Sequence, residues 1–377
     1  MNIGAFLVHW QLTIFILFCT IIFIQLFYYL FFFARLSFYN PKKNDIEQCH
    51  PVSVIICARD EAENIARNLP GSLVQNYPSS HEVIVVNDNS FDETKYLLEE
   101  LHKQFRQLKV VELSQEAKMI PGKKFPLSIG IKTARYEIVL LTDADCVPAS
   151  ENWIQTMQSA YTPQTEIILG YGAYAKKKGF LNKAIRWETF HAALQYLSYA
   201  LAGIPYMGVG RNLSYKKELF FKQKGFTSHN HIPGGDDDLF INKVATGKNT
   251  RIEILPDSFT ISKPANTWAK WIKQKKRHYT TGKFYKPVHK FALGTYSLSQ
   301  FLLYPSFIAA LLFFNWKPVL IIFIVRLLIQ SIVLFKSMKK LNELDLFPLF
   351  WFWDLWMFFY YLIFAGSLIK KPQPTWK

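Results

Sequence analysis

Charged side chains are missing from the start of this sequence. No Asp, Glu, Lys or Arg occurs from Asn2 to Ala34, although charged residues make up 19% of the whole chain. An apolar stretch of about 20 residues is long enough to cross a lipid bilayer as a helix. The segment also lacks the basic start and the small-residue cleavage pattern of a signal peptide. We therefore predict an N-terminal transmembrane helix within residues 1–36, with its apolar part near residues 11–34.

Cysteine is scarce as well, with four residues that show no paired spacing. This pattern argues against a structural zinc site and favours a reducing compartment. The net charge is +16, but many of the positive residues stand beside apolar segments, at Arg35, Lys42, Lys43 and across residues 270–290. Positive residues next to apolar helices mark the cytoplasmic face of a membrane. The sequence therefore predicts contact with membrane lipids, no nucleic-acid partner, and a cytoplasmic central domain.

Three more apolar segments occur near the carboxyl end, at residues 292–314, 318–335 and 346–369. We predict C-terminal transmembrane helices within residues 292–371, followed by a tail at residues 372–377. Three lysines precede the last segment and fit the cytoplasm, so a full crossing would leave the final lysines outside. That placement conflicts with the preference of positive loops for the cytoplasm. The last segment is therefore also open to a tilted or re-entrant arrangement.

Two charges interrupt these apolar segments, Arg326 and Asp354. At a rise of about 1.5 Å per residue, both lie at similar depths below the inner face of the membrane. An isolated charge at such a depth is costly, so we predict an ion pair between neighbouring helices. In the alternative that remains open, Arg326 binds a lipid phosphate.

Between the apolar ends, a polar connector at residues 37–50 leads into alternating strands and helices. Strands are predicted at residues 52–58, 82–86, 109–113 and 137–141, with a helix at residues 124–134 between the last two. This alternation indicates an α/β fold with a mostly parallel sheet, whose ligands gather at the carboxyl ends of the strands.

Acidic residues stand at three of these strand ends, as Asp60, Asp88 and the pair Asp143 and Asp145. Two carboxylates separated by one residue are able to share one hard divalent cation through their oxygen atoms. Such a cation would hold the phosphates of a nucleotide. A lone D-x-D motif is weak, but its position beside the other two strand ends strengthens the metal hypothesis.

The order of motifs resembles a known family. Val-Ser-Val-Ile-Ile-x-Ala-Arg-Asp-Glu is followed by Val-Ile-Val-Val-Asn-Asp-Asn-Ser, then Gly122-Lys123, then Thr-Asp-Ala-Asp. This series is similar to a membrane-bound family 2 glycosyltransferase with a GT-A catalytic domain, which we place at residues 51–270.

The resemblance implies a role for each motif. Asp60, Glu61 and Asp88 would bind the base and ribose of the donor, and Lys123 would lie near the nucleotide. Asp143 and Asp145 would serve the ribose and a Mg²⁺ or Mn²⁺ ion on the diphosphate. Plainer explanations stay open, because the first acids also suit a helix start, Asp88 a cap, and Lys123 a solvated loop.

Two further segments separate these motifs from the acidic run that follows. Residues 167–174 are predicted as one strand, and residues 190–207 as a helix that either lines an acceptor or lies in the core. The next segment, Gly208 to Ser214, resembles a G-x-N motif near the acceptor and makes Asn212 an acceptor-binding candidate. Its alternative is a turn into a strand.

The run Gly234-Gly235-Asp236-Asp237-Asp238-Leu239 places three carboxylates on a glycine turn, where they repel one another. It resembles the E-D-x-D-L pattern of the family, with Gly235 where a glutamate is common. Alignment on Leu239 implies Asp236 as the catalytic base, with Asp237 as the alternative. Asp238 takes the second acidic position or caps the following helix.

The basic segment at residues 271–291 contains Gln274, Arg277 and His278, which resemble a Q-x-x-R-W signature. The resemblance implies that Gln274 and Arg277 bind the donor and that Arg277 contacts the diphosphate. His278 stands where tryptophan would stack on a growing glycan, so it is an acceptor-binding candidate and weakens the case for a processive synthase. The segment also suits a simple membrane anchor.

Together these features predict a membrane-integrated, metal-dependent, inverting glycosyltransferase. The donor is expected to be a nucleotide sugar, in the first instance a UDP sugar, and the acceptor a lipid-linked molecule or a glycan. We expect it in a bacterial inner membrane, with the catalytic domain in the cytoplasm. A processive polysaccharide synthase and a non-catalytic membrane scaffold are the alternatives.

Overall fold

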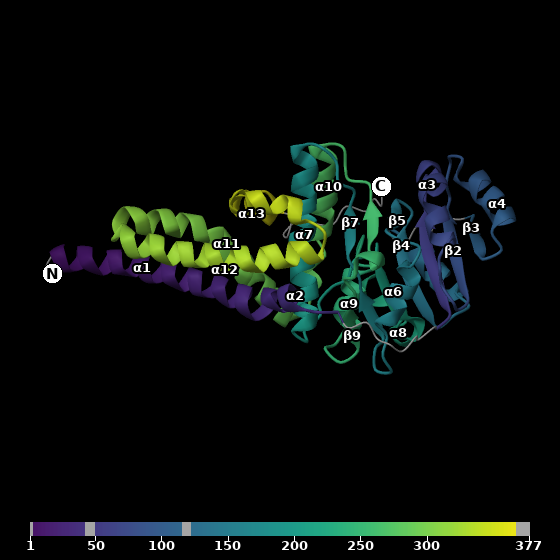
Figure 1. The fold of residues 1–377 in the computed structure, drawn as a ribbon, viewed down its shortest axis with the longest axis horizontal. Helices are drawn as coiled ribbons and strands as arrows, with labels where there is room; N and C mark the ends of the chain where they lie inside the picture. Colours follow the sequence, from purple (N-terminus) through teal and green to yellow (C-terminus); the bar gives the residue numbers. More distant parts are fainter. Residues whose placement is uncertain (1–2, 42–49, 115–121, 367–377) are drawn as a thin grey trace. The chain divides into compact units, whose positions relative to one another are not determined.

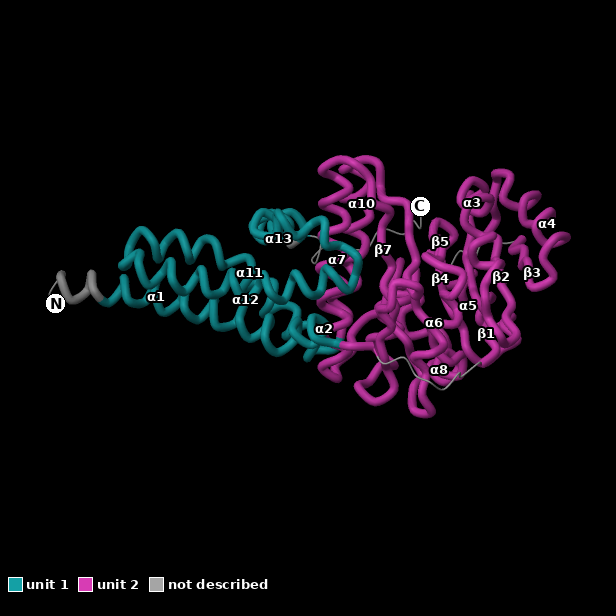
Figure 2. Tube along the Cα trace, viewed as in Figure 1, with its two compact units in different colours: residues 1–39, 286–370 teal, residues 40–285, 371–377 magenta. Residues whose placement is uncertain are grey.

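The computed structural model describes residues 3–41, 50–114 and 122–366. The chain forms two compact units, residues 40–285 in one and residues 1–39 with 286–370 in the other (Figure 2). The predicted tail at 372–377 and most of the predicted connector lie outside the described residues. The segment that we predicted as a separate juxtamembrane piece, 271–291, is divided, because its first part belongs to the unit that contains the sheet.

The larger unit contains ten strands in two sheets. The strands are β1 Val52–Ala58, β2 His81–Asp88, β3 Leu108–Leu113, β4 Ile138–Asp143, β5 Cys146–Pro148, β6 Ile167–Leu169, β7 Gly172–Tyr174, β8 Leu213–Lys216, β9 Thr250–Ile252 and β10 Thr260–Ser262. Its α-helices are α3 Ala62–Leu73, α4 Thr94–Gln104, α5 Lys124–Thr133, α6 Trp153–Ser159, α7 Phe180–Leu201, α8 Lys217–Lys222, α9 Asp238–Val244 and α10 Trp268–Tyr279.

The main sheet has the order β3-β2-β1-β4-β8-β6-β9. Strands β1 to β4 are parallel to one another, and β8 runs antiparallel to β4 and β6. Every residue of β1 is buried, because β1 lies inside the sheet and its β-branched run fills both faces. The predicted α/β fold with a mostly parallel sheet is thus confirmed.

Helices cover both faces of the parallel strands (Figure 1). One face packs on α3, α4 and α6 through a core that includes Val54, Leu69 and Trp153. On the other face α5 comes unusually close, since a Cβ added at Gly130 would lie 2.6 Å from Ile55. This packing positions the start of α5, where Lys123 is the N-cap and Lys124 the first helical residue, both of them part of the candidate site.

The strand predicted over residues 167–174 is two strands in different sheets. β6 joins the main sheet, whereas β7 joins β5 and β10 in the small sheet. The break falls at Gly170, where a Cβ would lie 2.4 Å from the side-chain amide of Asn212. That amide also donates a hydrogen bond of 3.0 Å to the Tyr171 carbonyl oxygen, which draws the chain out of the main sheet.

The helix predicted over residues 190–207 begins earlier and ends earlier, as α7 Phe180–Leu201. Gly203 has φ of 84°, a left-handed conformation that stops the helix. Most residues of α7 are buried, including Arg186 and Glu188. The burial agrees with the core-helix alternative.

The smaller unit contains the helices α1 Ile3–Phe27, α2 Ala34–Phe38, α11 Pro287–Phe313, α12 Trp316–Lys340 and α13 Phe350–Ala365. A π-helical turn, Tyr28–Phe33, joins α1 to α2. Four stretches are long and apolar enough to cross a membrane, one N-terminal and three C-terminal, as predicted. They are His9–Phe38, Pro287–Phe313, Trp316–Lys340 and Leu344–Phe364.

Helix α13 differs in direction from the other long helices of this unit. Figure 1 shows it nearly end-on, while α1, α11 and α12 lie along the plane of the view. α13 has 16 residues, which corresponds to about 24 Å, less than the roughly 30 Å of a hydrocarbon core. Together with the preceding 3₁₀ turn Leu344–Leu349, however, it forms the 21-residue apolar stretch Leu344–Phe364. The tilted or re-entrant arrangement of the last segment therefore stays a prediction.

A buried polar cluster joins the membrane helices. The Arg326 guanidinium contacts the Asp354 carboxylate at 2.5 and 3.0 Å, and both side chains are almost wholly buried. The predicted ion pair is therefore confirmed, and burial keeps Arg326 from reaching a lipid phosphate. Amide and hydroxyl groups from α1, the π-helical turn, α11 and α12 complete the cluster, namely Gln25, Tyr29, Gln300, Tyr304 and Gln330.

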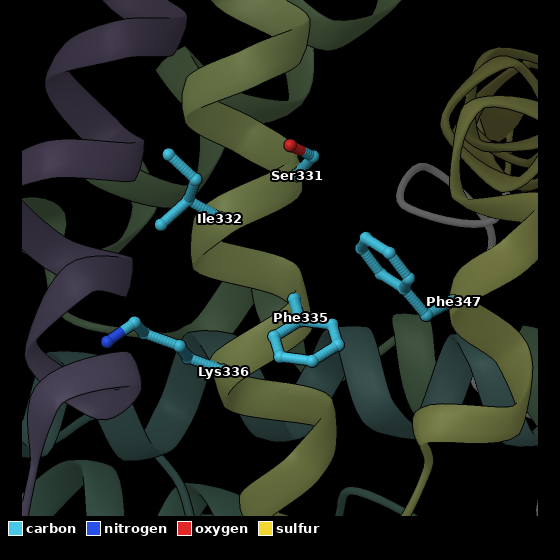
Figure 3. A pocket seen from close by; sticks show the side chains of 5 residues that line it. All are labelled: Ser331, Ile332, Phe335, Lys336 and Phe347. Atoms are coloured by element: carbon cyan, nitrogen blue, oxygen red, sulfur yellow. The ribbon is translucent and has the colours of Figure 1, made fainter.

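A shallow groove of about 230 Å³ runs along α12 (Figure 3). Its lining is mostly apolar and is made by Ser331, Ile332, Phe335, Lys336 and Phe347. The lining contains no carboxylate, and the ammonium of Lys336 lies 4.2 Å from the ring of Phe38. The groove thus lacks the acidic groups that the predicted chemistry needs.

The ion pair is expected to be essential for the stability of this unit. Arg326→Gln or Asp354→Asn leaves one buried charge without its partner, which costs about 3–5 kcal/mol. Thermal unfolding in detergent should show a midpoint lowered by more than about 5 °C for either variant. Arg35→Gln, which removes an exposed arginine of the same unit, should change the midpoint little.

The swapped double variant Arg326→Asp with Asp354→Arg should recover a large part of the loss. A double variant as unstable as the worse single variant would contradict a direct pairing of these two charges.

Candidate active site

The carboxyl ends of neighbouring strands bring the predicted acids to one edge of the main sheet. Asp60 and Glu61 follow β1, Asp88 ends β2, and Asp143 ends β4. The parallel register of β1 with both β2 and β4 places these ends side by side. The arrangement is the one expected for a ligand site of a parallel sheet.

The loops after β1 and β2 are held together by hydrogen bonds. Asp60 and Asn89 both have left-handed backbones, with φ of 52° and 51°. The Asp60 amide donates to the Ser90 hydroxyl at 2.9 Å, and the Phe91 amide donates to the Asp60 carboxylate at 2.8 Å. Left-handed conformations are uncommon for residues with a side chain and persist where surrounding contacts fix them. The two loops therefore form one preformed wall.

Glu61 and Asp88 line this wall. The Glu61 carboxylate accepts a hydrogen bond from the Asn64 side chain, and its charge helps to raise the pKa of Asp145. Asp88 is buried, with its carboxylate 3.9 Å from the Arg59 guanidinium. Glu61 thus lies near the D-x-D pair, whereas Asp88 ends the strand on the other side of β1 from Asp143.

Lys123 links two acids that are far apart in the sequence. Its ammonium lies 2.5 Å from a carboxylate oxygen of Asp143 and 3.4 Å from one of Asp236. Burial alone would raise the pKa of Asp143, but the adjacent Lys123 holds it below its usual value. The D-x-D motif and the predicted base are therefore in the same site.

Asp145 has less positive charge around it than Asp143, which is paired with Lys123. Burial and the charge of Asp143 raise the pKa of Asp145 to about 6. The Cys146 thiol is next to it, but burial raises the pKa of Cys146 well above its usual value and Ser262 lies 2.9 Å from the sulfur. A protonated thiol is a poor ligand for a hard cation, so the two aspartates are the better candidate ligands of this group.

The three consecutive aspartates point to different partners. Asp237 accepts hydrogen bonds from the amides of Gly210 and Asp238, both at 2.7 Å. Asp238 accepts from the hydroxyls of Thr281 and Tyr285, so its carboxylate binds inside the unit. Among the described residues, only Asp236 of the three is paired with Lys123.

Two buried residues that the sequence analysis did not select hold the aspartate loop. Lys124 donates to the carbonyl oxygens of His229 and Ile232, and the His229 ring lies 2.9 Å from the Gly235 carbonyl oxygen. Burial lowers the pKa of Lys124 to about 8. The only sequence signal for Lys124 is that two lysines follow Gly122. Spacing alone does not distinguish the lysine that is buried from the one that contacts the acids.

Asn212 has a structural position, in contrast to the predicted contact with an acceptor. It is fully buried, and its amide group is shared among Trp153, Tyr171 and Ser258. The residue before it, Arg211, lies beside the D-x-D pair instead, and its charge lowers the pKa of both acids. No sequence signal marked Arg211 beyond its place next to Asn212.

Helix α10 carries the basic signature. Gln274 donates a 3.4 Å hydrogen bond to the Tyr174 hydroxyl, and the charge of Arg277 reaches Asp143 and lowers its pKa. A buried ion pair between Lys275 and Glu188 joins α10 to α7. Desolvation by the surrounding protein, together with the charges of nearby cations, lowers the pKa of His278 well below its usual value, so this ring is neutral at physiological pH. The signature therefore lies at the same acidic edge.

The sequence profile of the glycosyltransferase-like family 2 matches residues 50–281, more than half of the chain. The chain belongs to this family. Its fold is also similar to that of a solved mannosyltransferase, PcManGT from Pyrobaculum calidifontis, in complex with GDP-Man and Mn²⁺. The TM-score is 0.59 at 20% identity, over 92% of this chain and 99% of that one. The likeness supports the GT-A fold.

Curated relatives of this family 2 glycosyltransferase match over parts of their length. A probable glycosyltransferase, YdaM of Bacillus subtilis, is 24% identical over 70% of this chain and 65% of its own. A beta-monoglucosyldiacylglycerol synthase of Nostoc is 34% identical over 26% of this chain and 21% of its own. A poly-beta-1,6-N-acetyl-D-glucosamine synthase of Staphylococcus epidermidis is 33% identical over 28% and 24%.

The donor atoms of the D-x-D pair suit a divalent cation in this glycosyltransferase. Asp143, Asp145 and Cys146 place one ligand atom each within 4.8 Å of one another. Mg²⁺ and Mn²⁺ prefer oxygen ligands. Burial and the charge of Asp143 raise the pKa of Asp145 to about 6, and a divalent cation would offset both effects. The two aspartates therefore fit the predicted metal.

The aspartate loop should weaken in acid through His229. Burial and the charge of Lys124 lower the pKa of His229 to about 4, from an ordinary value of 6.5. Between these pH values the unfolded chain binds a proton that the folded chain does not, so stability is lost as the pH falls through this range. The loss should approach about 3 kcal/mol.

Thermal unfolding at pH 7 and at pH 4.5 measures this effect. His229→Gln, which keeps a donor for the Gly235 carbonyl, should reduce the difference between the two pH values. His231→Gln, at an exposed residue of the same loop, should leave the difference as in the wild type. An unchanged difference in His229→Gln would assign the acid sensitivity to other groups.

Proposed function

We propose that this chain is a membrane-integrated, inverting glycosyltransferase that moves a sugar from a nucleotide-sugar donor to a lipid-linked or glycan acceptor. The observation that carries the proposal is the position of Lys123, whose ammonium contacts both Asp143 and Asp236. Transfer with inversion needs a base and a leaving-group site within one sugar ring of each other. A shared ammonium keeps the two carboxylates that close.

Asp236 is the proposed base. It takes the proton of the acceptor hydroxyl as that oxygen attacks the anomeric carbon from the face opposite the nucleotide. Asp237 and Asp238 are bound to backbone amides and hydroxyls, which leaves Asp236 as the carboxylate with a single lysine partner. The Lys123 ammonium lies 3.4 Å from the Asp236 carboxylate and holds it at the site.

The donor is proposed to lie along the acidic edge. Asp60, Glu61 and Asp88 bind the base and ribose, and Gln274 and Arg277 act at the diphosphate. Asp143 and Asp145 hold Mg²⁺ or Mn²⁺, which stabilises the negative charge of the departing diphosphate when bound. The Mn²⁺ and GDP-Man in the solved mannosyltransferase support a metal and a nucleotide sugar in this fold.

The acceptor is proposed to be lipid-linked and to receive a single sugar. Four stretches of the chain suit a membrane by length and composition, and one relative is named for a diacylglycerol product. The neutral His278 offers an imidazole where a tryptophan would stack on a glycan chain. We place the enzyme in a bacterial inner membrane, with its catalytic unit in the cytoplasm.

The base is tested by Asp236→Asn in the full chain. The variant should lose about 10²- to 10⁴-fold in kcat, because proton transfer from the acceptor is lost, while the affinity for nucleoside diphosphate stays within about threefold. Asp257→Asn, at an exposed residue of the same unit, should keep wild-type kcat. NMR of the product should show the anomer opposite to that of the donor. A fully active Asp236→Asn would reject Asp236 as the base.

The metal site is tested by thermal shifts with UDP, GDP and their sugar derivatives, with and without Mn²⁺. The wild-type protein should be stabilised by one nucleotide in the presence of Mn²⁺, and the shift grows with ligand concentration. Asp145→Asn should abolish the Mn²⁺-dependent part of the shift. A shift that is equal with and without Mn²⁺ would contradict a metal-dependent donor site.

A further inference from the structure

Arg211 is a cation of the site that neither the D-x-D motif nor the Q-x-x-R signature includes. It immediately precedes the buried Asn212 and strand β8, and its guanidinium carbon lies 4.5 Å from the centre of the Tyr174 ring. The Ser262 hydroxyl lies 3.3 Å from the guanidinium and 2.9 Å from the sulfur of Cys146, the residue after Asp145, so Arg211 lies beside the proposed metal ligands. Arg211 therefore borders the position of the diphosphate.

The guanidinium has hydrogen-bond donors to spare. A guanidinium carries five N–H donors, and here one donates to the Ser262 hydroxyl at 3.3 Å. Within residues 3–41, 50–114 and 122–366, no carboxylate lies within ion-pair distance of Arg211. Stacking on an aromatic ring engages the flat face of the guanidinium and leaves the N–H groups at its edge available. Such an arginine suits an anion that arrives with a substrate.

The surrounding backbone makes room for this side chain. A Cβ added at Gly172 would lie 3.2 to 3.4 Å from Arg211 atoms, including the guanidinium carbon. The Tyr174 hydroxyl accepts a hydrogen bond from Gln274 of α10, so the stacking ring is itself held by the helix that carries Arg277. Gly172, Tyr174 and Ser262, from the neighbouring strands β7 and β10, thus fix Arg211 between the acidic pair and α10.

We propose that Arg211 binds a phosphate oxyanion of a substrate through its free N–H edge. The inference rests on the proposed glycosyltransferase function and adds a second arginine to Arg277. Paired N–H donors match two phosphate oxygens, and this geometry makes arginine a phosphate ligand that lysine replaces poorly. The phosphate belongs either to the donor diphosphate or to a phosphorylated lipid acceptor.

The test uses the full chain in detergent with Arg211→Gln, Arg211→Lys and Gly172→Ala. Arg211→Gln removes the charge, Arg211→Lys keeps the charge without the paired donors, and Gly172→Ala crowds the native guanidinium. Arg251→Gln, at an exposed arginine of strand β9, is the matched control. Titrations measure the Kd of UDP, GDP, UMP and GMP with Mn²⁺, and of short-chain phosphatidic acid as a lipid phosphomonoester.

If the phosphate is that of the donor, Arg211→Gln weakens nucleoside diphosphate binding by about 10- to 100-fold and leaves monophosphate binding within twofold. If it is that of the acceptor, the same loss appears for phosphatidic acid and not for the diphosphates. In either case the affinity of Arg211→Lys for the phosphate probe should fall nearly as much as that of Arg211→Gln. The affinity of Gly172→Ala should fall less, and that of Arg251→Gln should not change.

The inference is overturned if all Arg211 and Gly172 variants bind every probe within twofold of the wild type. Arg211→Lys and Gly172→Ala keep the test informative if Arg211→Gln does not fold. Failure of the proposed function has a different signature, because the wild-type protein itself would then bind no nucleotide with Mn²⁺, while the phosphatidic acid titrations would still report on Arg211.

Discussion

A single ammonium group, that of the partly buried Lys123, holds the site together. Asp143 ends a strand of the central sheet, and Asp236 belongs to a glycine-rich loop far along the chain. Like charges repel, and two carboxylates would not stay together inside a protein without a cation between them. Lys123 provides that cation from the N-cap position of α5, and Lys124, the first residue of the helix, holds the loop by its carbonyl groups. The close packing of α5 on the sheet at Gly130 fixes both lysines.

The membrane helices follow the same principle. Arg326 and Asp354 are costly in an apolar setting when alone, but each satisfies the other, and three glutamines and two tyrosines supply further hydrogen bonds. Every long helix of that unit contributes at least one polar side chain to the cluster. The charges therefore specify which helices of this unit meet.

Sequence reasoning predicted those features that depend on local pattern or on depth. Runs of β-branched residues followed by acids predicted β1, β2 and β4. The similar depths of Arg326 and Asp354 below the membrane face predicted their ion pair. It failed where a contact in three dimensions decides the outcome. Asn212 fills the space above Gly170 and divides a predicted strand, and no spacing rule distinguishes that role from a contact with acceptor. Arg211 and Lys124 were missed because their roles depend on a stacking ring and on loop carbonyls from distant segments.

The central claim is that the D-x-D acids and Asp236 act on one bound donor. The most direct measurement is the rate of donor turnover in Asp145→Asn, in Asp236→Asn and in the double variant. Residues that act as one unit lose little more when both are removed. The account predicts that the double variant is about as slow as the slower single variant. A double variant whose loss equals the product of the two single losses would show that the acids work in independent sites.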